Sequence, residues 1–335
     1  MMRGANFIEG VETKQNRVWM VLLITAGAVL GLIALLLGSG ASVADFVALC
    51  ARIPLWTYGA IAFTQATIVV LAALRWRVLL KAVSPRGQTL TLQHATAATT
   101  LAAIAGQILP IQLCTPVIRA WFALRFDIPV MRSLGTSALE QTFQLLVLIS
   151  AAVLSFLFLV PTVGWVFDAV VPILVLGAMV IFVRFAIQVV SKLLASIADQ
   201  GTSLLARTAT RLRLGFEKAA QLPDRILTSV TALSLLGYTV LAALNVLLLN
   251  AISGVDILPL LIAYPLVLFL MSLPFFPGGL GVVEVTWAGV LTREGLPFDQ
   301  AVEAALALRV ISTLGFFLIA PLLLAGLQPA KRGVP

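Results

Sequence analysis

One stretch decides how this chain folds: Pro274-Phe275-Phe276-Pro277-Gly278-Gly279-Leu280-Gly281-Val282-Val283-Glu284, between the apolar runs 257–273 and 285–291. Proline lacks the amide donor and glycine loosens the backbone, so one helix is predicted to end near Pro274 and another to begin near Gly281. Backbone outside a helix is tolerated at membrane depth only where protein buries it or it lines a wet cavity. The stretch therefore predicts an internal site or pathway. The alternative is an ordinary loop between two spans, with Glu284 in a first turn that favours a carboxylate.

The composition establishes the class of protein. The 335 residues are 61% hydrophobic and 11% charged, which is typical of a polytopic membrane protein built of helices. The net charge of +8 comes from Lys and Arg in the gaps between apolar runs, as the positive-inside rule expects. This distribution indicates membrane topology and excludes nucleic-acid binding.

Cysteine and histidine are too few for metal or disulfide chemistry. Cys50 and Cys114 are the two cysteines, with no Cys-x-x-Cys or Cys/His spacing, so neither a disulfide framework nor a metal site is expected. A structural or interfacial role is favoured for His94, the sole histidine. No cofactor is expected, and the chain lacks a Walker loop or a nucleophile elbow.

The first two apolar runs predict the orientation. Residues 1–17 are polar and mildly basic, and the run 18–38 is too long for the core of a signal peptide, so it is predicted to be a retained span. The second run, 53–74, ends in Arg75-Trp76-Arg77. These cations and an interfacial Trp predict a cytoplasmic end there, and hence a cytoplasmic N-terminus.

A re-entrant hairpin is predicted over residues 92–125. Thr115-Pro116 has the form of an N-cap followed by proline at the first helical position, so the second arm should begin there. At about 1.5 Å per residue each arm is too short to cross comfortably. Arg125 then marks the return to the cytoplasm, whereas one long kinked span would place it outside.

Two further spans, 133–160 and 167–190, lead into a basic segment. In residues 191–225, leucines interleave with six Lys and Arg side chains. This pattern predicts an amphipathic connector on the anionic cytoplasmic leaflet, with a solvated basic loop as an equal alternative.

The remaining chain predicts a second set of the same elements. A span over 226–251, a hairpin over 257–292 entering from the external side and a span over 300–327 bring the tail, 329–335, to the cytoplasm, where Lys331 and Arg332 fit.

These elements define an all-α polytopic fold of about six spanning helices and two re-entrant hairpins. Its halves, 18–190 and 226–328, would form an inverted repeat in the cytoplasmic membrane, an architecture that recurs in transporters.

Four charged residues lie near the predicted hairpin breaks. Arg119 and Glu284 follow a break, and Glu140 and Arg309 lie a little inside the next span. A charge at such depth costs about 2.5 to 3.5 kcal/mol, so it should face an interior and find a partner. The alternative is that the pairs Arg119–Glu140 and Glu284–Arg309 only hold the hairpins in place. The predicted substrate-binding residues are Arg119, Glu140, Gly278, Gly279, Gly281, Glu284 and Arg309.

The chain resembles the flippase-like integral membrane family, also called the lysylphosphatidylglycerol synthase transmembrane region, the membrane half of the multiple peptide resistance factor. The resemblance rests on residues 274–281 with Glu284, and on Ala305-Leu306-Ala307-Leu308-Arg309. Residues 75–80 and 106–124 and Glu140 follow in the family's order. Of the family's Pro-Gly-Arg-x-Gly-Glu stretch, only Pro110 is retained, and Gln141 stands where a basic residue is common.

The resemblance implies a lipid flippase that moves a phospholipid, an aminoacyl-lipid or a polyprenyl-phosphate-linked lipid through a central polar cavity. Arg119 and Arg309 would supply guanidinium donors to anionic oxygens, and the glycines would let a headgroup approach the main chain. Eight residues follow the last predicted span, so no attached soluble catalytic domain is expected. The alternatives are a membrane-embedded lipid or glycosyl transferase, with Glu140 or Glu284 as base, and a non-transporting scaffold for a partner transferase.

Overall fold

The structure of the chain is a computed structural model in which the described residues are 53–83, 90–107, 109, 111–159, 192, 195–196, 222–272 and 281–327. Within these ranges it contains eight α-helices, two short 3-10 helices and no strand. The predicted all-α class is therefore confirmed. Most of the predicted connector 191–225 lies outside the described residues, as do all of the terminal segments 1–17 and 329–335.

Four of the helices are long: α3 (Leu55–Val83), α6 (Val130–Leu159), α9 (Asp224–Ser253) and α12 (Phe298–Leu323). Each contains an apolar stretch that is long enough to cross a bilayer. They match four of the predicted spans. The other two, 18–38 and 167–190, lie outside the described residues.

Helix α3 corrects one prediction, because it continues past residue 74 to Val83. It ends just before Ser84-Pro85, where proline disfavours the helical conformation of the residue that precedes it. Arg75 and Trp76 are consequently inside the protein, with 5% and 0% of their surface exposed. The predictions that the span ends at residue 74 with Arg75 beyond it and that Trp76 lies at the interface are wrong, whereas the cytoplasmic side of this end stays a prediction.

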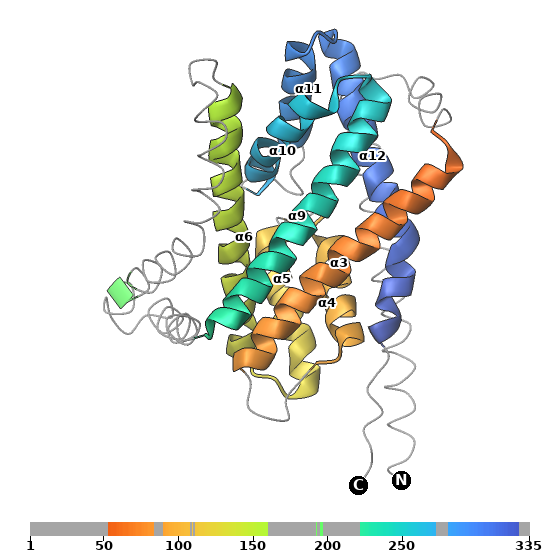
Figure 1. Cartoon of the computed structure of the whole chain (residues 1–335). Coiled ribbons are helices and arrows are strands. Elements are labelled where there is room, and N and C mark those ends of the chain that lie inside the picture. The colour runs from red at the N-terminus through yellow and green to blue at the C-terminus, as the bar shows by residue number, and fades with distance from the viewer. Residues whose placement is uncertain are drawn as a thin grey trace.

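The other four helices are short: α4 (Leu92–Ala105), α5 (Ile111–Ala123), α10 (Ile257–Met271) and α11 (Val282–Arg293). Their 12 to 15 residues span about 18 to 23 Å, less than the roughly 30 Å of a hydrocarbon core. They pack as two pairs, α4 with α5 and α10 with α11. The two pairs lie toward opposite ends of the long helices (Figure 1).

Helix α5 corrects a second prediction, since it begins at Ile111 and not at Thr115-Pro116. Pro116 lies inside the helix and cannot donate to the Gln112 carbonyl four residues earlier. The Gln141 side chain on α6 donates to that carbonyl instead, at 2.9 Å. A contact between helices thus makes Pro116 tolerable inside α5, which sequence spacing does not show.

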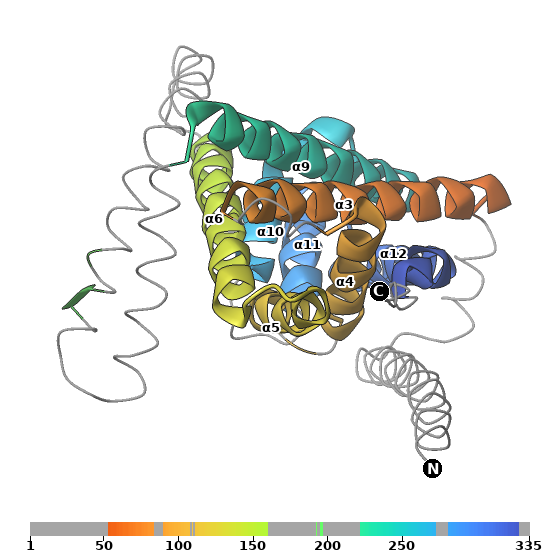
Figure 2. The ribbon, with the colours of Figure 1, turned by 90° about the horizontal axis from the view of Figure 1, so that it is seen from below.

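The order long helix, short pair, long helix occurs twice, as α3-α4-α5-α6 and as α9-α10-α11-α12. The two series interlock: α10 packs along α6, and α4 packs against α12 and the 3-10 helix η3 (Leu324–Leu327) that follows it. Helices α3 and α9 lie side by side (Figure 2). Each short pair is therefore held between elements of both series.

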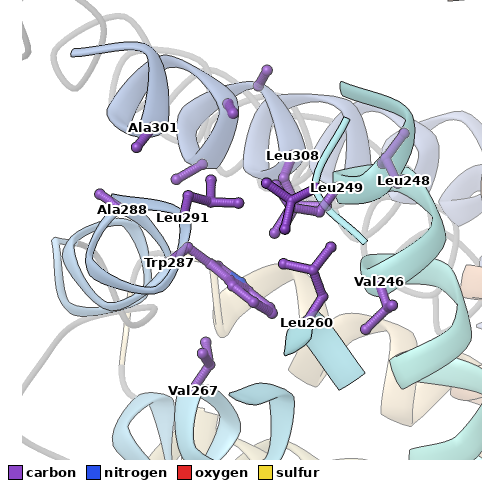
Figure 3. Close-up of a cluster of buried hydrophobic side chains, with 14 of the residues drawn as sticks. Val246, Leu248, Leu249, Leu260, Val267, Trp287, Ala288, Leu291, Ala301 and Leu308 are labelled. Carbon is purple, nitrogen blue, oxygen red and sulfur yellow. The ribbon is translucent and has the colours of Figure 1, made fainter. Parts of the chain in front are cut away.

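An apolar core holds the second short pair against α9 and α12. Trp287 of α11 is 1% exposed and lies among Leu249, Leu260 and Val267 (Figure 3). Its ring stacks on Tyr264 of α10, with the centroids 6.1 Å apart. This packing fixes the position of α11, whose first turn carries Glu284.

Candidate functional site

The first turn of α11 forms one ion pair of the site. Gly281 precedes the helix with φ +81°, a conformation that residues with a Cβ rarely adopt. One oxygen of the Glu284 carboxylate accepts from the Gly281 N–H at 2.7 Å, and the other accepts from Arg309 Nη1 at 2.8 Å. Glu284 therefore caps α11 and joins it to α12 at the same time.

The first half contains a larger cluster, which we call the triad: Arg75, Arg119 and Glu140. Arg119 Nη1 donates to Glu140 Oε2 at 2.5 Å, and Arg75 Nε donates to Glu140 Oε1 at 3.2 Å. Each of the three residues is at most 5% exposed. With both arginines and the carboxylate ionised, the triad carries one excess positive charge.

Neighbouring groups hold the arginines of the triad. Arg119 Nη2 donates to Thr99 Oγ1 at 3.2 Å, and the Arg119 guanidinium lies 5.1 Å from the centre of the Trp76 ring. The amide oxygen of Gln144 accepts from Arg75 when that amide is oriented to satisfy its neighbours. The triad thus joins α3, α4, α5 and α6 in one packed node.

A cavity of about 280 Å³ lies between the two series of helices. This is near the roughly 300 Å³ at which ligand pockets begin. Its wall combines many apolar side chains with carboxamides, hydroxyls and one arginine. The polar residues in the wall are Gln65, Gln107, Gln112, Asn245, Tyr264, Arg309, Ser312 and Thr313.

Arg309 is the only residue with a charged side chain among the described residues that line the cavity. Its side chain is 13% exposed, compared with 2% for the side chain of Arg119. Glu284 stands behind Arg309 and does not itself line the cavity. The second ion pair therefore presents its cation to the cavity and its anion to the start of α11.

Three of the four carboxamides in the wall, those of Gln65, Gln107 and Asn245, donate within the protein. Asn245 Nδ2 donates to the Leu241 carbonyl at 2.8 Å and to the Tyr264 hydroxyl at 3.2 Å. Gln65 and Gln107 donate weakly to backbone carbonyls, at 3.4 and 3.5 Å. Asn245 donates twice and Gln65 and Gln107 once each, whereas the three amide oxygens accept no hydrogen bond from the part of the chain that is described.

A family model, that of the lysylphosphatidylglycerol synthase TM region, matches residues 19–320. The chain belongs to this family. The match includes the triad, the Glu284–Arg309 pair and the cavity, and it identifies the chain as an integral membrane protein of a family linked to lipid modification and flipping. No curated protein and no solved structure matches the chain.

In this member of the lysylphosphatidylglycerol synthase TM region family, the predicted site residues fall into two groups. Both expected pairs, Arg119 with Glu140 and Glu284 with Arg309, are in contact. Arg309 lines the cavity, whereas Arg119 and Glu140 lie in the buried triad and do not. Gly278 and Gly279 lie outside the described residues. The substrate-binding role of each residue stays a prediction.

Some of the polar groups of this family member were not predicted from its sequence. The buried Arg75 is one of them, because the sequence predicts a span that ends at residue 74 whereas α3 continues to Val83. Residues 75–84 contain neither Pro nor Gly, and this absence is a usable signal that the helix continues toward Pro85. The position of Gln65 and Asn245 in the wall of the cavity could not be predicted. A single amide in an apolar helix does not indicate whether its face of the helix meets a cavity, lipid or another helix.

Proposed function

We propose that this protein moves an anionic lipid headgroup across the membrane through the cavity beside Arg309. The observation that carries the proposal is a guanidinium in the wall of a cavity bounded by both series of membrane helices. An ionisable side chain at such depth is costly and commonly marks a substrate pathway. The family's link to lipid modification and flipping supports the same conclusion.

The chemistry of the wall suits a phosphate ester. An anionic phosphate oxygen that leaves water needs charge-assisted donors, and a guanidinium supplies several in a planar fork. Glu284 neutralises Arg309 while no headgroup is bound, which lowers the cost of keeping the arginine inside the membrane. A phosphate would then share Arg309 with Glu284.

The arrangement of the helices supports an inverted repeat with two re-entrant hairpins. The short helices cannot cross the hydrocarbon core, and their pairs lie toward opposite ends of the molecule (Figure 1). The two ion pairs have opposite polarity in the two halves. In the first half the cation, Arg119, is on the short helix and the anion, Glu140, is on the long helix that follows. In the second half the anion, Glu284, is on the short helix and the cation, Arg309, is on the long helix. We place both termini in the cytoplasm, as the Lys and Arg distribution predicts.

In this proposal the triad holds α3, α4, α5 and α6 together, and the headgroup passes through the cavity that Arg309 lines. The triad is buried and bonded to its neighbours, so its carboxylate and guanidinium groups already have protein partners. A rigid node of this kind keeps α5 fixed beside the cavity while other helices move.

A vesicle assay tests the proposal. The purified protein is reconstituted with phosphatidylglycerol that carries a nitrobenzoxadiazole label on its acyl chain, and dithionite reports the label in the outer leaflet. Wild-type protein is expected to expose nearly all of the label, and Arg309→Gln to slow exposure at least tenfold. Arg293→Gln makes the same charge change at the exposed C-terminal end of α11 and should leave the rate unchanged.

A second variant separates loss of function from misfolding. Arg309→Gln leaves Glu284 without its cation, whereas Glu284→Gln/Arg309→Gln removes both charges. The double variant should remain folded and still be slow, because the cavity then lacks its guanidinium. Undiminished movement in the folded double variant would refute the role of Arg309. A lipid product of changed mass would instead support the transferase alternative.

A further inference from the structure

The charge of the cavity wall discriminates between classes of headgroup. Among the described residues of the wall there is a cation, Arg309, and no carboxylate. Both oxygens of the adjacent Glu284 carboxylate already accept hydrogen bonds, from Gly281 and from Arg309. The charge of the pair that faces a headgroup is therefore the Arg309 guanidinium, while Glu284 lies on the side of α11.

An ammonium group would find no counterion in this wall. Moving a cation out of water is costly unless an anion pairs with it, and Arg309 would repel it. Aromatic faces do not substitute for a carboxylate here. Tyr264, Trp287 and Phe316 are the aromatic residues among the described part of the wall. Each ring packs against another ring, and the three residues are only 4%, 1% and 4% exposed, so little ring face is open to a cation.

Hydroxyl groups, in contrast, would complete the hydrogen bonding of the wall. The amide oxygens of Gln65, Gln107 and Asn245 accept nothing from the described protein, and Gln65 and Gln107 each use only one of their two N–H groups. A hydroxyl donates to such an oxygen without bringing a charge into the cavity. A hydroxyl both donates and accepts, so amides with an open oxygen and an open N–H, together with one guanidinium, match a phosphodiester that carries a polyol.

We infer that the cavity selects phosphodiester headgroups that carry hydroxyls and rejects those that carry an ammonium group. Phosphatidylglycerol satisfies the rule, as does a sugar linked to a polyprenyl phosphate. Lysylphosphatidylglycerol does not, because its lysyl group adds two amines. This inference rests on the proposed function and adds a headgroup class to it.

Binding tests the inference independently of transport. Purified full-length protein in detergent is mixed with equimolar phosphatidylglycerol and lysylphosphatidylglycerol, and native mass spectrometry measures which lipid is retained. At least a tenfold preference for phosphatidylglycerol is expected. Equal retention, or a preference for the lysyl lipid, would overturn the inference. A mannosyl phosphate polyprenol is the third lipid, and if it exceeds phosphatidylglycerol, the phosphodiester comes from a polyprenyl carrier.

A substitution in the wall tests whether charge causes the preference. Thr313 lines the cavity one helical turn after Arg309, so Thr313→Glu places a carboxylate beside the guanidinium. The preference for phosphatidylglycerol should fall at least fivefold in Thr313→Glu and persist in Thr313→Gln, which has the same shape without the charge. A preference that is the same in both variants would show that the charge of the wall does not select the headgroup.

Transport rates separate the two proposals. If phosphatidylglycerol crosses vesicles at least ten times faster than the lysyl lipid, both are supported. If the lysyl lipid crosses as fast, translocation stands and the headgroup inference fails. If neither crosses faster than in protein-free vesicles but phosphatidylglycerol is preferentially retained, the site has the inferred selectivity and the proposed translocation is wrong.

Discussion

Replacing Glu140 with Gln tests whether charge holds the triad together. Glu140 is the only carboxylate that contacts Arg75 and Arg119 among the described residues, and all three are buried. The substitution preserves the shape of the side chain and removes its charge. Two guanidinium groups then remain in the protein interior without a counterion.

The expected loss of stability follows from the desolvation of the arginines. Removing one partner of a buried ion pair costs about 3 to 5 kcal/mol, and here both arginines lose the same partner. Arg75→Met is the contrasting variant, because it leaves the Arg119–Glu140 pair and removes the excess positive charge. We expect Arg75→Met to cost less than about half as much as Glu140→Gln.

Thermal unfolding in detergent measures the difference. The folded fraction that remains after heating is followed by size-exclusion chromatography with fluorescence detection. At about 2 to 4 °C per kcal/mol, Glu140→Gln should lower the melting temperature on the order of 10 °C. If Glu140→Gln melts within about 2 °C of the parent, or if Arg75→Met is the less stable variant, the assignment of the triad as an ionic node is wrong.

Two further predictions concern contacts between helices. A Cβ on Gly315 of α12 would lie 2.4 Å from Cγ2 of Ile61 on α3, so Gly315→Ala should destabilise the protein by about 1 to 3 kcal/mol, and Ile61→Ala in the same chain should restore most of the loss in thermal unfolding. Gln141→Leu leaves the Gln112 carbonyl without its donor, at a cost of about 1 to 3 kcal/mol. Pro116→Ala should suppress that cost, because Ala restores the N–H that can bond to this carbonyl within α5.

Matched controls make both predictions decisive. Gly289 lies inside α11 with nothing within 4 Å of an added Cβ, so Gly289→Ala should be neutral or slightly stabilising. Equal effects of alanine at both glycines would show that helix packing against Ile61 is not the cause. Additive effects of Gln141→Leu and Pro116→Ala would likewise contradict the shared carbonyl.

The positions of the helices were largely predictable. The four described long helices and the two short pairs follow from the lengths of the apolar runs and from the breaks predicted within residues 92–125 and at residues 274–281. Helix length in a membrane is set by the thickness of the hydrocarbon, and unpaired backbone there is tolerated only in special places. An apolar run and a proline or glycine break are therefore local signals, which can be interpreted without knowing which residues pack against them.

The ends of α3 and α5 were not predictable in the same way. Cations after an apolar run suggest a membrane boundary, yet Arg75 is buried because Glu140 lies opposite it. Thr-Pro suggests a helix start, yet Pro116 lies inside α5 because Gln141 satisfies the freed carbonyl. In both cases a partner far along the chain changes what the local pattern means.

Composition, the proline and glycine breaks and the buried charges were enough to define a polytopic helical membrane protein with two interrupted helices and two ion pairs. Only the packed helices show that Arg309 faces a cavity while Arg119 is enclosed. The reason is that lipid tails and protein interior are equally apolar, so a membrane helix does not record in its hydropathy which side meets lipid, protein or cavity. That choice is made when the helices pack against one another.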